Sequence, residues 1–230
     1  MTDALPPAAV GDATLADLRP RLIEAVLPHV PFDGWTDRSL AAGARALGID
    51  PAVARLAFPE GARDMVEAWI DLANRRMLEA LDTPEFRARK VREKVALAIR
   101  TRLEQAAAHR EAVRKAAHFL ALPAHAGLAA RTTWKTADAI WRAAGDTATD
   151  LNHYSKRLLA GAVYAATLLV WLDDDSEGFE RSWAFLDRRI AGIMRFEKVK
   201  AELRRLGGDP ESRPSLIRFL GRLRYPARQD

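Results

Sequence analysis

The sequence contains no cysteine, which excludes disulfide bonds, cysteine-ligated zinc, iron–sulfur clusters and a cysteine nucleophile. Glycine and proline are scarce, at 13 and 12 of 230 residues, and this excludes a collagen-like rod and a Pro/Gly-rich low-complexity chain. Hydrophobic residues make up 49% of the chain and charged residues 29%. A chain of this length and composition is expected to bury a substantial core.

Long hydrophobic runs are also missing. The longest nearly continuous apolar run covers residues 158–172, and its fifteen residues are fewer than a membrane-spanning helix needs. The first residues, MTDALPPAAVGD, have neither the basic start and apolar core of a secretory signal nor the arginines of a transit peptide. We therefore expect a soluble, intracellular protein.

We expect an all-α fold, because nearly every periodic segment repeats its apolar residues every three to four positions. Thr14 and Asp50, the latter followed by Pro51, stand where the N-caps of helices are expected. The expected helices cover about 15–26, 37–46, 51–58, 60–81, 84–103, a segment ending at 122, a segment with Trp134 and Trp141, 146–172 and 176–206. The apolar stripe of the 84–103 helix comprises Val91, Val95, Ala98, Ile99, the stem of Arg102, and Leu103.

The composition divides the chain into four expected parts: a helix-turn-helix subdomain at 1–60, a larger helical domain at 61–206, a linker at 207–213 and a final helix with its tail at 214–230. The segment PSLIRFLGRLRY that begins at Pro214 has one apolar and one cationic face. It either docks on the protein or binds an anionic membrane surface, and its arginines favour the membrane. Its expected membrane-binding residues are Leu216, Ile217, Arg218, Phe219, Leu220, Arg222, Leu223 and Arg224.

The three helices expected in residues 1–60 are arranged like a helix-turn-helix, and the sequel FPEG (58–61) resembles the junction of TetR-type regulators. The third helix, however, carries one basic side chain, Arg55, where a DNA-reading helix offers several polar ones. Residues 1–60 hold 5 basic and 8 acidic residues, a net charge of −3, although the whole chain is +5. This charge would repel a phosphate backbone, so we expect no nucleic-acid binding.

Several motifs together resemble one family. They are PFDGWT (31–36), FPEG (58–61), VREKVALAIRTRL (91–103), LALP (120–123), IWRAAGDTATDLNHYSKR (140–157), VWLDDDS (170–176) and SWAFLDRRI (182–190). In this order the chain resembles the accessory family of coenzyme Q biosynthesis that is the ninth of the Coq series. The resemblance implies a TetR-like fold with a degenerate helix-turn-helix and a pocket for isoprenoid quinone lipids. It also implies presentation of a quinone precursor to a di-iron hydroxylase.

Family members attach to the membrane by a C-terminal amphipathic helix, so the resemblance implies a peripheral protein on the inner membrane of a bacterium. A homodimer is expected by fold analogy alone. The helix expected at 149–172 combines large apolar residues with small ones, and this pattern alone favours close helix packing over a lipid site. The resemblance favours the lipid site, for which the candidate residues are Phe119, Leu158, Gly161, Ala162, Ala165, Leu168, Leu169 and Trp183.

A second candidate site is a protein-binding face. Trp134, Asp138 and Trp141 fall on one side of a helix, where the two tryptophans are either interface anchors or core residues. The resemblance implies that the hydroxylase docks on the face around Asp138, Trp141, Asp150, His153, Tyr154 and Arg157. His153 stands where the family has an aromatic residue.

The motifs of catalysis and metal binding are missing from the sequence. The five histidines form no H-E-x-x-H and no His/carboxylate pair at helical spacing, and the run Asp173–Asp175 is expected to be a solvated turn. There is no G-x-S-x-G elbow and no Gly-rich phosphate loop. We therefore expect a lipid-binding accessory protein that is not an enzyme and uses no cofactor. The alternatives are a ligand-responsive transcription regulator and a lipid-modifying enzyme.

Overall fold

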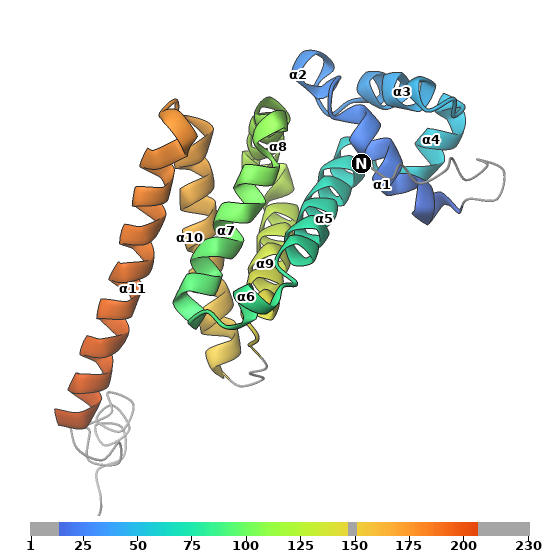
Figure 1. The fold of residues 1–230 in the computed structure, drawn as a ribbon. Helices are drawn as coiled ribbons and strands as arrows, with labels where there is room; N and C mark the ends of the chain where they lie inside the picture. Colours follow the sequence, from blue (N-terminus) through green and yellow to red (C-terminus); the bar gives the residue numbers. More distant parts are fainter. Residues whose placement is uncertain (1–13, 147–150, 207–230) are drawn as a thin grey trace, which may run out of the picture. The chain divides into compact units, whose positions relative to one another are not determined.

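The computed structural model describes residues 14–146 and 151–206, and within them every regular element is helical (Figure 1). This agrees with the all-α class expected from the three-to-four-residue periodicity. The chain separates into two compact units, Met1–Asp187 and Arg188–Asp230. The described part of the second unit is the continuation of one helix, residues 188–206. The division into parts at 60, 206 and 213 remains a prediction.

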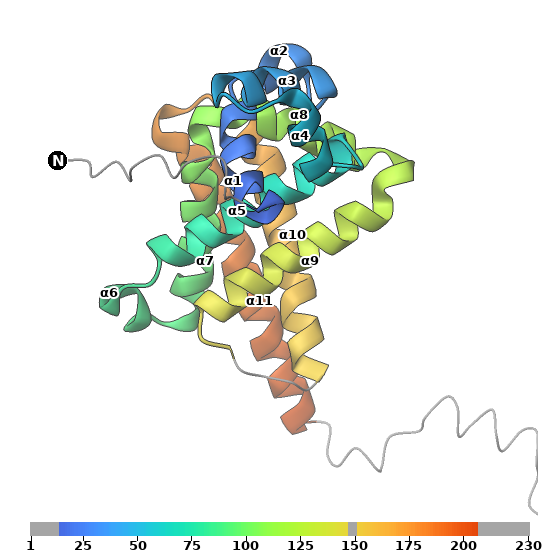
Figure 2. The ribbon, with the colours of Figure 1, turned by 90° about the vertical axis from the view of Figure 1, so that its right-hand side faces the viewer.

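Four helices form the N-terminal subdomain: α1 (Leu15–Val26), α2 (Val30–Asp33), α3 (Asp37–Ala46) and α4 (Pro51–Ala57). They lie together at one end of α5 (Figure 2). Thr14 caps α1 through a capping box with Asp17, and the Asp50 side chain accepts a hydrogen bond from the backbone N–H of Ala52 to begin α4. The predicted caps are thus confirmed. The single-turn α2 was not predicted.

The contact between α1 and α3 depends on Gly43. A Cβ atom at Gly43 would lie 2.9 Å from the backbone of Ala25 and Val26 in α1. Because backbone atoms cannot yield as a flexible side chain can, only glycine permits this separation. The two helices pack with Leu22, Val26, Leu40 and Ala44 fully or almost fully buried.

The larger helices are α5 (Ala62–Ala80), α7 (Val91–Gln105), α8 (Arg110–Ala121), α9 (Ala126–Ala143), α10 (Leu151–Leu172) and α11 (Glu180–Leu206). Helix α9 is central, since it packs against α5, α7, α8 and α10. The core of these helices includes Met65, Met77, Ile99, Leu128, Ile140 and Trp171.

One predicted long helix is in fact two. The 84–103 segment divides into α6 (Pro84–Arg87) and α7, which begins at Val91. Thr83 caps α6, but Lys90 has an extended backbone and interrupts the helix before Val91. The apolar periodicity of α7 starts only at Val91, so the polar stretch before it contained the signal for the break.

Helix α10 is longer and more apolar than the fifteen-residue run suggested. Its segment Tyr154–Leu172 is, by length and composition alone, sufficient to cross a membrane. Residues of this segment are nevertheless part of the packed core, because Ala160, Tyr164, Trp171 and Leu172 are buried and the helix packs on α7 and α9. The core helix of a folded bundle has the same appearance, so length and composition alone do not indicate a membrane span.

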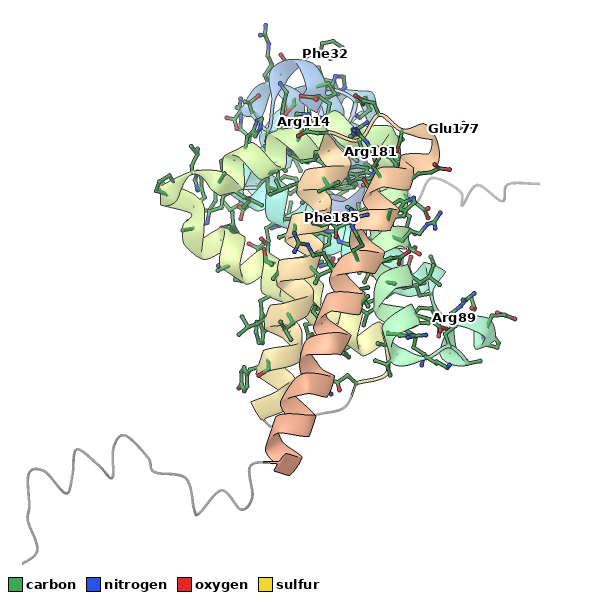
Figure 3. All side chains as sticks on the ribbon, turned by 90° about the vertical axis from the view of Figure 1, so that its left-hand side faces the viewer. Phe32, Arg89, Arg114, Glu177, Arg181 and Phe185 are labelled. Atoms are coloured by element: carbon green, nitrogen blue, oxygen red, sulfur yellow. The ribbon has the colours of Figure 1, made fainter. Side chains whose placement is uncertain are left out.

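The turn after α10 is held by charged side chains. Arg110 and Arg114 of α8 donate hydrogen bonds to the backbone carbonyl oxygen of Leu172, and Arg114 also pairs with Asp173 (Nη1–Oδ1 2.8 Å). Arg181, at the start of α11, donates to the Asp174 carboxylate (Nε–Oδ1 3.0 Å). Figure 3 labels Arg114 and Arg181 near this turn. These bonds satisfy carbonyl groups that a helix end leaves without partners.

Candidate functional site

A cavity of about 250 Å³ lies among five helices, α5, α7, α8, α9 and α10. Alanine, leucine and threonine side chains provide most of its wall. Its lining comprises Trp69, Ile70, Arg102, Leu103, Ala106, Val113, Ala116, Ala117, Leu120, Ala121, Ala129, Thr132, Thr133, Thr136, Tyr164, Ala165, Leu168 and Leu169. A mainly apolar wall with a few polar groups is typical of small-molecule sites.

The cavity has a buried floor and an exposed rim. Trp69, Leu103 and Thr136 are buried, whereas Ala121 of α8 is exposed and Leu169 of α10 is 62% exposed. The two exposed residues place the opening between α8 and α10. An apolar ligand that entered there would remain in contact with apolar side chains from the surface to the floor.

The structure separates the predicted lipid-binding residues into three groups. Ala165, Leu168 and Leu169 line the cavity. Leu158 and Ala162 lie on the exposed side of α10, which Ala165 and Leu169 share by their helical spacing. Gly161 is buried where α10 meets α9.

At Gly161, a Cβ atom would stand 3.2 Å from Cγ2 of Thr133. This glycine therefore permits close helix packing, the alternative that the small-residue pattern had left open, while its neighbour Thr133 lines the cavity.

Phe119 and Trp183 lie outside the cavity lining. The Phe119 ring stacks on His125 with 3.9 Å between ring centroids. Trp183 is buried, donates from Nε1 to the carbonyl oxygen of Gly178 at 2.7 Å and has the Arg100 guanidinium 5.0 Å from its ring centroid. Both contacts stabilise the fold around the cavity.

The predicted protein-binding face contains a buried ionic cluster. Arg157 of α10 is 3% exposed, and it pairs with Asp138 of α9 (Nε–Oδ1 2.7 Å) and with Asp146 (Nη1–Oδ2 3.2 Å). Lys156 also pairs with Asp146, and Arg142 with Asp138. Burial alone would raise the pKa of Asp146, but the hydrogen bonds and charges of Lys156 and Arg157 outweigh it and lower that pKa. The cluster joins α9 to α10.

The aromatic residues of this face lie around the cluster. The rings of Trp134 and Tyr154 are 5.9 Å apart, and Tyr154 is 57% exposed. Trp141 donates from Nε1 to the carbonyl oxygen of Lys156 at 2.8 Å. Asp150 and the side chain of His153 lie outside the part of the chain that the structure describes, as do the predicted membrane-binding residues 216–224. Arg157 positions the helices, whereas Tyr154 offers exposed surface.

Sequence reasoning missed three residues at the cavity floor. Arg102 and Tyr164 line it, and Asn74 lies behind them as the hydrogen-bond acceptor of Arg102 (Nε–Oδ1 2.8 Å). The sequence places the stem of Arg102 on the apolar stripe of α7, and this register is the available signal. Nothing in the sequence indicated that the charged end is buried as well.

Among the side chains that the structure describes, which leave out those of residues 151–153 and 194–206, no group of three or more histidine, aspartate or glutamate residues is placed to hold a metal ion. Helix α4 stands where a helix-turn-helix has its DNA-reading helix, and it exposes a single basic side chain. Leu56 is 67% exposed, and Arg55, which is 60% exposed, lies 3.6 Å from the Asp37 carboxylate (Nε–Oδ2).

Comparison with known proteins supports the resemblance read from the motifs. Residues 126–197, which contain α9, α10 and the start of α11, match the family model COQ9. The chain is 28% identical over 197 residues to the human ubiquinone biosynthesis protein COQ9, mitochondrial, and 29% identical over 189 residues to the protein of that name from Drosophila melanogaster. These alignments cover 83% and 80% of this chain, which spans 62% and 58% of the lengths of those relatives.

The fold has its own counterpart among solved structures. It matches the TetR transcriptional regulator from Nitrosomonas europaea with a TM-score of 0.62 and 20% identity, over 76% of this chain and 96% of that one. At this identity the likeness concerns the fold alone. The predicted resemblance is confirmed: by sequence the chain is related to the COQ9 proteins, and its all-α fold is TetR-like.

Proposed function

We propose that the chain takes part in ubiquinone biosynthesis as a lipid-binding accessory protein, which holds a polyprenylated quinone precursor in the cavity and presents it to a di-iron hydroxylase. The observation that carries the proposal is the apolar cavity that opens at Leu169, in a chain related to ubiquinone biosynthesis proteins. A polyprenyl chain leaves a bilayer only if another apolar surface receives it. The cavity and the exposed side of α10 supply that surface.

The cavity fits a headgroup rather than a whole lipid. A cavity of about 150 Å³ is sufficient for benzene, so about 250 Å³ accommodates a substituted ring but no long tail. The tail would continue along the exposed apolar side of α10, past Leu169, Ala162 and Leu158. The same proposal includes a peripheral location on the inner membrane of a bacterium, through residues 214–230, and a homodimer through the last helices. It assigns the protein no catalytic step of its own.

A side chain that fills the cavity should stop lipid transfer. We expect Ala165→Phe to reduce the transfer of ubiquinone from donor to acceptor vesicles by at least about fivefold, because a ligand and the added ring would overpack the site at a cost of about 1–3 kcal/mol. Ala80→Phe is the matched control, since Ala80 is exposed at the end of α5, outside the cavity lining and away from the side of α10 along which the tail would lie. Transfer by Ala165→Phe at the wild-type rate, with the protein folded, would contradict the proposal.

The competing function, DNA-binding regulation, is tested by filter binding at low salt with duplex DNA. We expect retention no stronger than non-specific binding, with a Kd weaker than about 1 μM, because residues 1–60 are net −3 and α4 exposes Leu56. A tight complex whose affinity fell steeply with salt would favour a regulator instead. The test uses the complete chain, so that any contribution of the basic regions is included.

A further inference from the structure

The cavity contains a buried positive charge. Arg102 of α7 is 4% exposed and lines the cavity among apolar and threonine side chains. An arginine guanidinium keeps its charge in proteins, and burial of an ion without a countercharge is costly. Among the described side chains, Arg157 is about equally buried, but it has two carboxylates beside it. Arg102 therefore differs from Arg157 in what surrounds its charge.

The partners of Arg102 are neutral. Its Nε donates to Asn74 Oδ1 at 2.8 Å, and its guanidinium carbon lies 5.2 Å from the centroid of the Tyr164 ring. In the described part of the chain, its charge forms no ion pair and its terminal nitrogens form no hydrogen bond. A guanidinium has five N–H donors, so most of them remain for a ligand.

A carboxylate matches this arrangement, and it is smaller than a phosphate, the other anion that a guanidinium binds through two bonds. A guanidinium binds a carboxylate through two parallel N–H···O bonds, and such charge-assisted bonds are about twice as strong as neutral ones. A neutral carbonyl would fill the donors but leave the charge uncompensated at the cavity floor. Arg102 is buried, whereas Leu169 at the rim is 62% exposed, so the charge lies deep in the cavity and orients the ligand.

We infer that the cavity selects a lipid whose head is a carboxylate, held by Arg102 at the floor, with the apolar tail directed outward past Leu169. This inference rests on the proposed function and narrows it, since the cavity would then bind a precursor that still carries an acidic group more tightly than a neutral quinone, which it also accepts. Asn74 and Tyr164 are positioning residues: Asn74 fixes Nε of Arg102 and Tyr164 supports the guanidinium with its ring.

The test is isothermal titration of the purified full chain at pH 7.5 with four probes. Decanoate and 4-hexylbenzoate are carboxylates, and decanamide and 4-hexylbenzamide are their neutral counterparts of the same shape. We expect each carboxylate to bind at least about tenfold more tightly than its amide. The carboxylate that binds more tightly shows whether the cavity prefers a fatty chain or an aromatic ring.

The variants assign the preference to one residue. Arg102→Met should abolish it and Arg102→Lys should keep part of it, whereas Arg92→Met, the same charge change at an exposed position of α7, should leave it intact. If Arg102→Met does not fold, the wild-type and Arg102→Lys titrations still decide. Equal affinity for acid and amide, or a preference that persists in Arg102→Met, would overturn the inference while leaving the proposed lipid binding in place. Failure of all four probes to bind folded protein would also overturn the inference, whereas the proposed lipid binding is decided separately by the ubiquinone transfer experiment.

Discussion

Asp174→Asn is expected to lower the free energy of unfolding by about 3–5 kcal/mol, the largest effect of any substitution proposed for this protein. The Asp174 side chain is fully buried and accepts five hydrogen bonds. Oδ1 accepts from the N–H and Oγ of Ser176 and from Arg181, and Oδ2 accepts from the N–H and Oγ of Ser182 at 2.8 and 2.6 Å. Asparagine replaces one acceptor oxygen by a donor that faces other donors.

Asp175→Asn is the matched control. Asp175 is the next residue, its side chain is 91% exposed, and its pairing with Arg110 is long at 3.6 Å. The control should cost less than about 1 kcal/mol, as exposed ion pairs do. Urea unfolding followed by circular dichroism measures both values. Equal stability of the two variants would show that the Asp174 network does not stabilise the turn between α10 and α11.

The same carboxylate makes stability depend on pH. Burial would raise the pKa of Asp174, but the hydrogen bonds from Ser176, Ser182 and Arg181 outweigh it and hold that pKa well below the ordinary value of 3.8. The contribution is therefore fully present above about pH 4 and is lost as the pH falls below this value toward the folded-state pKa. Wild type should lose more stability than Asp174→Asn between pH 5 and pH 3.

Arg157→Met should cost about 3 kcal/mol, because it leaves Asp138 and Asp146 partly buried without the cation that lies between them. The loss is smaller than that of a completely isolated charge, since Arg142 and Lys156 remain beside the two carboxylates. Arg142→Met is the control. Its side chain is 62% exposed, so its removal should cost less than about 1 kcal/mol.

The consequence of Arg157→Met for the site would be visible at Asp146. Without Arg157, the pKa of Asp146 should rise from its lowered value, which is measurable by nuclear magnetic resonance titration of the carboxylate. An unchanged pKa together with unchanged stability would contradict the role assigned to the cluster. A protein-binding role of this face would then rest on Tyr154, Trp134 and Trp141 without support from the α9–α10 junction.

Local signals in the sequence were sufficient for most helices but not for the cavity. Thr14, Asp50 and Thr83 act at short range, through hydrogen bonds to residues two or three positions away, so each cap was predictable. The break before Val91 was missed because apolar periodicity locates the packed part of a helix more sharply than its start. The short α2 gives no periodicity at all.

The cavity depends on distances between helices that are far apart in sequence. Ala165, Leu168 and Leu169 were identified from their own helix, but which neighbours face them is a tertiary property. Arg157 illustrates the same limit: resemblance placed it on a protein-binding face, and only the packed structure shows that it is buried against Asp138 and Asp146. The periodicity of α7 predicts that the aliphatic stem of Arg102 lies on an apolar stripe. It does not predict that the groups around the guanidinium are neutral.

The central claim, that this cavity holds an isoprenoid lipid, is tested most directly by native mass spectrometry of the chain purified without detergent. We predict a mass increment of one polyprenylated lipid per chain, which organic solvent removes and which fragmentation identifies as a quinone precursor. Ala165→Phe should lack the increment, and the control Ala80→Phe should retain it. Folded wild-type protein that carries no lipid, and takes none up from ubiquinone-containing vesicles, would contradict the claim.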